Sequence, residues 1–537
     1  MLPAQRLVLL VAAAALAGCW REAPALGEHG IRHVVLISLD TTRADHLGCY
    51  GSTVTSTPAI DGLAREGALF ADVLAPAPTT LPSHTSMMTG TYPHTHGVVR
   101  NGFVVHADNV MLAEILKGAG FHTAAFLGSF AMERLFDFDQ GFDHFDEEFE
   151  ILYGTHGKAD QDQRRADAVT DAVLAHVDEV GTRRRLFLFA HYFDAHAPYD
   201  PPPAFAPRGD DGQPLAWDPD EYTQAVRDHQ EEIDGQSYGL GGVILTGLPR
   251  SLVEKATGEP SEIDRKLARL YAGEVEFIDS EIGRLLRGLE GRGVLEDALV
   301  VLTGDHGETF WEHGDFWNHG LMAYQTTVHI PLILRFPDGF GAGRRIEQTV
   351  STIDLVSTLC EALAFDEVPA RVEGKSLAPL LAGRPFERGA VYCQANQPGW
   401  RLEPKDRWGN LYKARVVREG RWKFVQVPYM QGLEQLFDLA ADPGEKSDLL
   451  RGGAGQLPPE AAAAYARLKA KVLRWVRTHP LLPSQFNSAQ AEDALARIKE
   501  LREHGYVGDE DMDKQGDLLP GATDSERDAE KEGEEGD

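Results

Sequence analysis

Cysteine is scarce in this chain, which contains four among 537 residues. Cys19 lies close to the N-terminus, which leaves Cys49, Cys360 and Cys393 for the rest of the chain. Three is an odd number and their spacing matches no metal-binding knuckle, so the sequence does not predict a disulfide framework. Cys360 lies in an apolar helical pattern and Cys393 in a strand pattern, which is typical of buried structural thiols.

Basic residues are also few, with 52 Lys and Arg against 83 Asp and Glu and a formal net charge of −31. A broad nucleic-acid-binding surface needs a basic face, so the composition argues against that class of protein. Part of the negative charge lies in residues 506–537, where few apolar residues accompany the Asp and Glu. We expect this acidic tail to be disordered, because it cannot bury enough apolar surface to order itself.

Long hydrophobic runs are absent as well. The run Leu7–Ala17 is too short to cross a bilayer as a stable helix, and it ends in Leu16-Ala17-Gly18-Cys19. Residues 1–18 therefore resemble the signal peptide of a bacterial lipoprotein. We expect Cys19 to be lipidated, residues 19–30 to form a tether, and the protein to be held at the cell envelope, in the periplasm or on the outer surface. A plain secretory signal remains the alternative.

Strand and helix patterns alternate over the first two thirds of the chain. His33–Leu39 (HVVLISL) is an almost continuous apolar run, which is typical of a parallel strand buried on both faces. Further strands are expected at 68–73, 122–127, 186–190, 299–303 and 332–336, and helices at 58–65, 111–117, 162–180 and 261–289. This alternation predicts an α/β fold with a mostly parallel central sheet.

The pattern fails between Tyr199 and Pro260, where Pro, Gly, Asp and Gln dominate, and we take this insertion as a candidate lid. Beyond it, short strand patterns with tight turns predict a small antiparallel sheet, at 390–394, 412–417, 422–427 and 434–439. Helical patterns follow at 459–479 and 488–504. The predicted organisation is a large α/β domain over 31–385 and a C-terminal α+β domain over 386–505.

Polar residues follow three of the predicted strands. Asp40 ends the first strand, Asp305 and His306 follow the strand at 299–303, and His191 and His196 follow the strand at 186–190. Ligands of doubly wound sheets bind outside the carboxyl ends of the strands. Any one of these carboxylates could be a helix cap, but carboxylates and imidazoles that converge on one crevice indicate a metal site.

The stretch Thr79–Gly90 predicts a helix of one to two turns with Pro82 at its first position and Gly90 at its end. Thr80 would then lie just ahead of a helix N-terminus, where backbone N–H groups and the helix dipole favour an anion. The alternative is an ordinary helix start rich in Ser and Thr.

Three stretches carry a resemblance to a known family: Ser38–Gly51 (SLDTTRADHLGCYG), Thr80–Gly97 (TLPSHTSMMTGTYPHTHG) and Gly304–Gly314 (GDHGETFWEHG). They resemble the sulfatase family of the alkaline phosphatase superfamily, and the similarity continues in the same order from about residue 31 to residue 450. The resemblance implies an α/β sandwich, a bound divalent cation and hydrolysis of sulfate or phosphate esters.

By position, Asp40, Asp305 and His306 match the metal ligands of that family, whereas Thr41 stands where a second Asp is usual. The nucleophile signature C/S-x-P-x-R reads Thr80-Leu81-Pro82-Ser83-His84 in this chain. Threonine is a secondary alcohol and cannot become formylglycine, and His84 replaces the arginine. Related enzymes of the superfamily, such as nucleotide pyrophosphatases and phosphoethanolamine transferases, use a metal-bound Thr.

The resemblance therefore implies that Thr80 is both a metal ligand and the nucleophile. His196 and His319 match positions that contact the anionic group or the leaving oxygen, so each is a candidate general acid. His84, Arg43 and His191 are candidates for binding the substrate. Several alternatives stay open: an ion pair of Arg43 with Asp45, Asp194 as a metal ligand or a partner of His191 or His196, a second metal held by His313 and His319, and Ser83 as a competing hydroxyl.

The expected substrate is an anionic ester whose organic part the sequence does not identify. The cation could be Ca²⁺ or Mg²⁺, which prefer oxygen ligands, or Zn²⁺ or Mn²⁺, which suit imidazole. Alternative functions are a sulfuric ester hydrolase without formylglycine, a phosphoryl-group transferase, and a catalytically degenerate lipoprotein that binds an anion or a glycan.

The lipoprotein motif gives a direct prediction. Replacing Cys19 (Cys19→Ala) should move the protein from the detergent phase to the aqueous phase in Triton X-114 partitioning, because the acyl chains that hold it to the membrane would be lost. Wild-type protein that already partitions into the aqueous phase would contradict lipidation.

Overall fold

The computed structural model describes residues 27, 29–149, 163–222, 260–314, 319–320, 322–365, 368–395, 414–428 and 432–478. The predicted signal peptide, Cys19, the acidic tail, the helix at 488–504 and most of the candidate lid (223–259) lie outside these residues. Among the described residues no helix is both long and apolar enough to cross a bilayer. The domain limits at 31–385 and 386–505 stay predictions.

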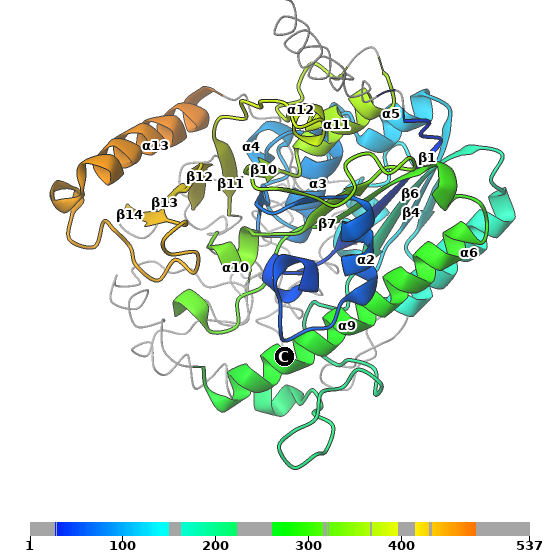
Figure 1. Ribbon diagram of the computed structural model, residues 1–537, viewed down its shortest axis with the longest axis horizontal. Helices are drawn as coiled ribbons and strands as arrows, with labels where there is room; N and C mark the ends of the chain where they lie inside the picture. Colours follow the sequence, from blue (N-terminus) through cyan, green and yellow to red (C-terminus); the bar gives the residue numbers. More distant parts are fainter. Residues whose placement is uncertain are drawn as a thin grey trace, which may run out of the picture.

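A large sheet forms the centre of the molecule (Figure 1). In the described part of the chain it has eight strands, in the order β5-β4-β6-β1-β7-β8-β2-β9. The strands are β1 (His33–Leu39), β2 (Ala68–Phe70), β4 (Phe121–Phe126), β5 (His144–Asp146), β6 (Arg185–Tyr192), β7 (Ala298–Gly304), β8 (Leu332–Arg335) and β9 (Arg344–Ile346). Strands β5, β4, β6, β1 and β7 run parallel, and β8 runs antiparallel to its neighbours β7 and β2. The predicted α/β fold with a mostly parallel sheet is confirmed.

Helices cover both faces of this sheet because its strands are apolar on both sides. Along β1, Val34 and Leu36 belong to one hydrophobic core, and Val35 and Ile37 belong to the other. The first core packs on α3 (Thr80–Thr89), α5 (Leu112–Gly118), α11 (Asp354–Ala362) and α12 (Ala378–Leu381). The second packs on α2 (Pro58–Glu66), α6 (Ala166–Val180) and α9 (Glu262–Glu290), of which α6 and α9 lie side by side (Figure 1).

Two short helices and a two-stranded sheet complete the large domain: α4 (Pro93–His96), α10 (Gln325–Val328), and β3 (Val73–Leu74) paired with β10 (Val350–Ser351). Most predicted elements are confirmed to within a few residues. Ser261 caps α9, and its hydroxyl accepts from the Asp264 backbone N–H at 3.2 Å. Cys360 and Cys393 are buried, and the three described cysteines are free thiols.

Two predicted elements are present but differ in extent from the prediction. The single strand expected at 68–73 is two strands, β2 and β3, because the chain leaves one sheet at Ala71–Asp72 and enters another. Helix α3 has ten residues rather than one to two turns. It begins at Thr80 after Thr79 in an extended conformation, so Pro82 is its third residue and not its first. Proline is tolerated there because the first turn of a helix has no carbonyl partner for its N–H groups.

The predicted C-terminal antiparallel sheet is confirmed, and it consists of β11 (Val391–Gln394), β12 (Arg415–Glu419), β13 (Trp422–Val427) and β14 (Leu433–Asp438) in that order. One face carries Phe424 and Leu436, which pack against Leu468 of α13 (Pro459–Thr478). The other face carries Val416 and Val425, which join the first core of the large sheet.

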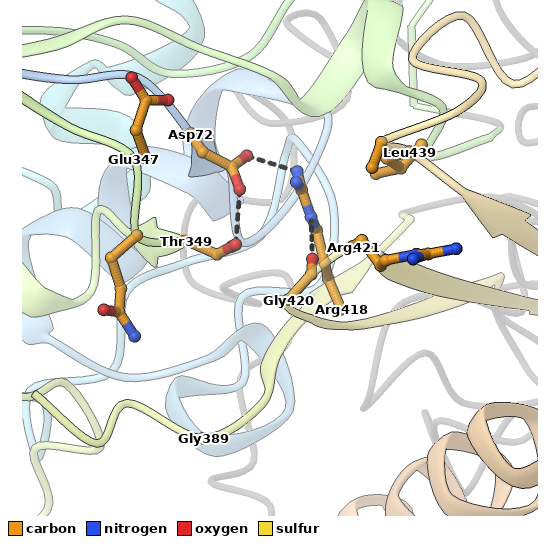
Figure 2. A pocket seen from close by; sticks show the side chains of 10 residues that line it. Asp72, Glu347, Thr349, Gly389, Arg418, Gly420, Arg421 and Leu439 are labelled. Carbon is orange, nitrogen blue, oxygen red and sulfur yellow. Dashed lines mark hydrogen bonds and ion pairs between the residues drawn. The ribbon is translucent and has the colours of Figure 1, made fainter. Parts of the chain in front are cut away.

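Ion pairs join this small sheet to the large one. Arg418 and Lys423 are opposite each other on β12 and β13. Arg418 forms an ion pair with Asp72 beside an open pocket of about 400 Å³ at the junction (Figure 2). The Lys423 Nζ atom lies 2.6 Å from Glu445 Oε1, and both side chains are fully buried. Glu445 also accepts the backbone N–H of Gln325, so the pair ties the sheet to the start of α10.

The buried pair gives a prediction about stability. Lys423→Met should lower the free energy of unfolding by about 3–5 kcal/mol, because it leaves the Glu445 carboxylate buried without its partner. The matched control is Lys469→Met, which removes the more exposed partner of Glu434 and should cost about 1 kcal/mol or less. Equal shifts of the thermal midpoint in the two variants would contradict this assignment.

Candidate functional site

The parallel pairing of β1 with β7 brings the predicted metal ligands together. Leu39 pairs with Gly304 at the ends of the two strands, so the residues that follow, Asp40 and Asp305, leave the sheet side by side. Asp40, Asp305 and His306 each offer one ligand atom, and these atoms lie within 4.8 Å of one another. All three side chains are fully buried. Among the described His, Cys, Asp and Glu residues this is the one such group.

The hydrogen bonds of the two carboxylates leave one oxygen of each unused. Asp305 Oδ1 accepts the backbone N–H groups of Thr41 at 3.2 Å and His306 at 2.6 Å. Asp40 Oδ2 lies 3.1 Å from His191 Nε2. Asp305 Oδ2 and Asp40 Oδ1 have no hydrogen-bond partner, and they lie 3.3 and 3.9 Å from His306 Nε2. Buried oxygens without a donor are rare, and here they face one ring nitrogen.

The electrostatics of the group fit a divalent cation. Burial raises the pKa of Asp40 to about 7, and burial and the neighbouring Asp40 raise the pKa of Asp305 well above the carboxyl range. Burial also lowers the pKa of His306 well below its usual value, which keeps its ring neutral. Two buried carboxylates are costly unless a positive charge accompanies them. Two oxygens and a neutral imidazole can supply that charge by holding a cation, and this donor set does not single out one metal.

Thr80 begins α3 beside this group. Its Oγ1 lies 3.5 Å from His306 Nε2, and its hydroxyl lowers the pKa of Asp40 against the larger effect of burial. Thr80 is fully buried, and Gly90 ends the helix in the left-handed conformation as predicted, with φ +69°. The hydroxyl of Thr80 therefore belongs to the same cluster as the three ligands.

Ser83 and His84 are engaged in holding α3 in place. The Ser83 hydroxyl donates to the Asp305 backbone carbonyl at 2.7 Å. His84 lies with Nε2 2.7 Å from Ser38 Oγ and Nδ1 2.8 Å from the Thr80 carbonyl oxygen. Because the Ser83 hydroxyl already donates to the Asp305 carbonyl, it is not free to act as the nucleophile in the alternative left open above. His84 connects α3 to β1 through these contacts, and its role in binding the substrate stays a prediction.

His319 and His196 continue the row of imidazoles that starts at His306. The His319 ring centroid lies 4.4 Å from that of His306 and 5.2 Å from that of His196. Burial lowers the pKa of His319, but Glu308, 3.3 Å from its Nδ1, and the carboxylates Asp40 and Asp305 outweigh burial and raise it. His319 therefore holds a proton more readily than an ordinary imidazole and more readily than His306, as a general acid requires.

The remaining predicted residues lie around the cluster in supporting positions. The Arg43 guanidinium forms ion pairs with Asp45 and Glu312 at 2.8 Å each. This is the alternative in which Arg43 pairs with a carboxylate and holds the loop. His191 orients Asp40 through the contact at 3.1 Å. Asp194 accepts the first backbone N–H of α6 from Ala166 at 3.1 Å and lies outside the ligand group. His313 stacks on Tyr324, with the ring centroids 3.9 Å apart, and it lies outside the ligand group of the described residues.

Asn101 is a site residue that sequence reasoning missed. Its Oδ1 accepts the backbone N–H of Leu81 at 2.9 Å, and its Nδ2 is buried without a hydrogen-bond partner. Pro82 has no N–H, and Ser83 donates its N–H to Thr79. The start of α3 therefore offers an anion fewer backbone N–H donors than predicted. The Asn101 side-chain amide contributes one N–H donor next to this helix start. The sequence Arg100-Asn101-Gly102 is typical of a turn and carries no signal of this role.

The fold and the cluster define a class of protein, an α/β protein with candidate ligands for a divalent cation at the carboxyl edge of its sheet. Comparison with protein families identifies the group within that class. The family model described as Sulfatase matches residues 32–364, and the model described as N-sulphoglucosamine sulphohydrolase, C-terminal, matches residues 311–456. The chain belongs to the sulfatase family and is an ester-cleaving hydrolase, and enzymes of this family use a divalent metal.

Individual relatives are distant. The chain is 24% identical to an N-acetylglucosamine-6-O-sulfatase of Bacteroides thetaiotaomicron, over 82% of this chain and 86% of the relative. The structure of the protein BT4656 in complex with its substrate D-glucosamine-2-N,6-O-disulfate superposes on this chain with a TM-score of 0.63 at 19% identity. The superposition covers 84% of this chain and 99% of BT4656. A phosphonate monoester hydrolase of Agrobacterium radiobacter superposes with a TM-score of 0.59 at 21% identity, over 82% and 95%. These likenesses show the shared fold.

The cluster predicts a measurable affinity for cations. Asp305→Asn should weaken the binding of Mn²⁺ to the metal-stripped protein by about a hundredfold or more, since loss of an outer-sphere partner alone costs about 10- to 100-fold. Asp279→Asn is the matched control, because this buried carboxylate accepts the Ala59 and Ile60 N–H groups at the start of α2. Equal affinities of the two variants in equilibrium dialysis would contradict the assignment of the cluster.

Proposed function

We propose that this protein hydrolyses phosphate esters, with sulfate esters as the second candidate, and that the Thr80 hydroxyl is its nucleophile. The observation that carries the proposal is the place of Thr80 Oγ1, which is fully buried and lies 3.5 Å from His306 Nε2 of the ligand cluster. A hydroxyl held among ligand atoms is where a nucleophile of this kind belongs.

Asp40, Asp305 and His306 would hold the cation, together with Thr80. When bound, the cation would lower the pKa of the Thr80 hydroxyl and offset the negative charge of the ester. His191 keeps Asp40 oriented, and the Thr41 and His306 N–H groups keep Asp305 oriented. Fixed ligands of this kind make the geometry of the site ready before the substrate arrives.

The reaction follows from the positions of the side chains. Thr80 loses its hydroxyl proton to solvent, and its oxygen forms a bond to the phosphorus while the bond from phosphorus to the leaving oxygen breaks. That oxygen takes a proton from His319, with His196 next to it as the alternative donor. Water then attacks the phosphorus of the threonine ester and gives one proton back to His319. The bond from phosphorus to the Thr80 oxygen breaks, and that oxygen takes up a proton from solvent as the phosphate is released. The Asn101 amide is placed to donate to an oxygen of the transferred group.

The nature of the nucleophile supports phosphate over sulfate. Threonine carries one oxygen on Cβ, so its covalent intermediate opens only when water attacks the phosphorus or sulfur atom. A formylglycine hydrate has a second hydroxyl on that carbon, and this chain lacks it. Relatives named for sulfate esters and for phosphonate monoesters are both similar to this chain, which keeps sulfate as the second candidate.

Thr80→Ala should lower kcat/KM for nitrophenyl phosphate or bis(nitrophenyl) phosphate by about a thousandfold or more, since loss of a nucleophile leaves only binding and electrostatic catalysis. Thr79→Ala is the matched control, because Thr79 is the adjacent buried threonine and its hydroxyl has no hydrogen-bond partner. It should stay within about tenfold of the wild type.

Two results would overturn parts of the proposal. Turnover at the wild-type rate by a folded Thr80→Ala variant would show that Thr80 is not the nucleophile. Turnover of nitrophenyl sulfate alone, with none of the phosphate mono- or diesters, would replace the phosphoesterase with the sulfate-ester candidate.

A further inference from the structure

Thr41 has an unusual backbone conformation next to the metal ligands. Its φ is +49°, in the left-handed region, where a β-branched residue is a rare outlier. A residue held in this way costs about 1–3 kcal/mol, and it persists only where its surroundings fix it. Such strain clusters at functional sites, and here it lies between Asp40 and the loop of Arg43.

The conformation of Thr41 has a consequence for Asp305. It directs the Thr41 N–H at Asp305 Oδ1, 3.2 Å away. With the His306 N–H at 2.6 Å, Oδ1 has two backbone donors, and this fixes the carboxylate with Oδ2 directed at His306 Nε2, 3.3 Å away. The turn at Thr41 therefore decides which oxygen of Asp305 is available to a cation.

The contact that holds this turn comes from Tyr271 on α9. Its hydroxyl donates to the Thr41 carbonyl at 2.9 Å and accepts the Arg43 N–H at 2.9 Å. One oxygen thus closes the loop on both sides of Thr42. The tyrosine is fully buried, and its ring packs at centroid distances of 5.1 Å from Phe310 and 4.9 Å from His46. The ring fixes where the hydroxyl lies.

We infer that Tyr271 is a positioning residue for the cation site: its hydroxyl holds Thr41 in the left-handed conformation and so orients Asp305. The inference rests on the proposed function, since it takes Asp305 as a ligand. It gives α9 a role beyond packing, because the helix connects the second hydrophobic core to the geometry of the site. Tyr271 acts through Thr41 and Asp305 and does not touch the substrate.

The test removes one oxygen atom. Tyr271→Phe keeps the ring and its packing, and it should weaken binding of Mn²⁺ or Zn²⁺ to the metal-stripped protein by about 10- to 100-fold. Tyr50→Phe is the matched control, because the Tyr50 hydroxyl also joins two backbone groups: it donates to the Phe70 carbonyl at 2.9 Å and accepts the Leu332 N–H at 2.7 Å. Among the described residues, the Tyr50 hydroxyl makes no hydrogen bond to Thr41 or to the three candidate ligands, and Tyr50→Phe should leave the metal affinity unchanged.

A second variant separates positioning from general stability. Glycine adopts a positive φ without strain, so Thr41→Gly removes the need for a residue that holds the turn. In the Thr41→Gly background, Tyr271→Phe should change the Mn²⁺ affinity by less than about threefold, because the two effects are coupled through one turn. An equal loss in both backgrounds would overturn the inference, as would wild-type affinity in the single Tyr271→Phe variant.

Asp305→Asn separates failure of this inference from failure of the proposed function. If that variant binds Mn²⁺ as the wild type does, the cation site itself is wrong and the inference falls with it. If it loses the metal while Tyr271→Phe keeps it, the cation site stands and only the role of Tyr271 is refuted. Thermal midpoints of the metal-free proteins show which variants are folded.

Discussion

The parallel pairing of β1 with β7 is the constraint on which the site depends. Both strands are buried on both faces, so each is fixed by hydrophobic contacts above and below the sheet. A shift of one residue would exchange the two faces of a strand, and it would also separate Asp40 from Asp305. The free energy of burying Val34 to Leu39 and Leu299 to Leu302 therefore determines where two carboxylates meet. The packing of the core therefore fixes the positions of the candidate metal ligands.

The cluster places demands on the rest of the molecule that an apolar core alone would not meet. The buried polar side chains of the site include those of Asp40, Asp305, His84, His191, His306 and the strained Thr41. Each of them needs a hydrogen-bond partner or a cation. Helix α3 supplies Thr80 and His84, β6 supplies His191, and α9 supplies Tyr271. The contacts of α3 and α9 cross from a helical layer to the edge of the sheet, and the contact of His191 with Asp40 joins the neighbouring strands β6 and β1. The site and the packing of the layers therefore stabilise each other.

The sequence predicted those parts of the structure that depend on local pattern. Strand β1 was predicted to the residue, and β7 and β6 nearly so, because continuous apolar runs of this length are strong signals. Asp40, Asp305 and His306 followed from their place at strand ends. Asn101 and Tyr271 could not be predicted, since a turn asparagine and a helical tyrosine have the same local pattern whether or not they reach the site. The conformation of Thr41 is likewise set by contacts with residues far away in sequence.

The replacement of arginine by His84 changes the charge of the site as well as its shape. Burial lowers the pKa of His84 well below its usual value, so this side chain is neutral. The two carboxylates would balance one divalent cation, and His319, whose pKa is raised, is the group left to oppose the charge of the ester. One positive charge suits a monoanion, and a phosphodiester, a phosphonate monoester and a sulfate ester each carry one negative charge. Charge therefore does not distinguish these esters. Under the proposed mechanism the single oxygen of Thr80 would distinguish them, because the intermediate that it would form must be opened at phosphorus or sulfur.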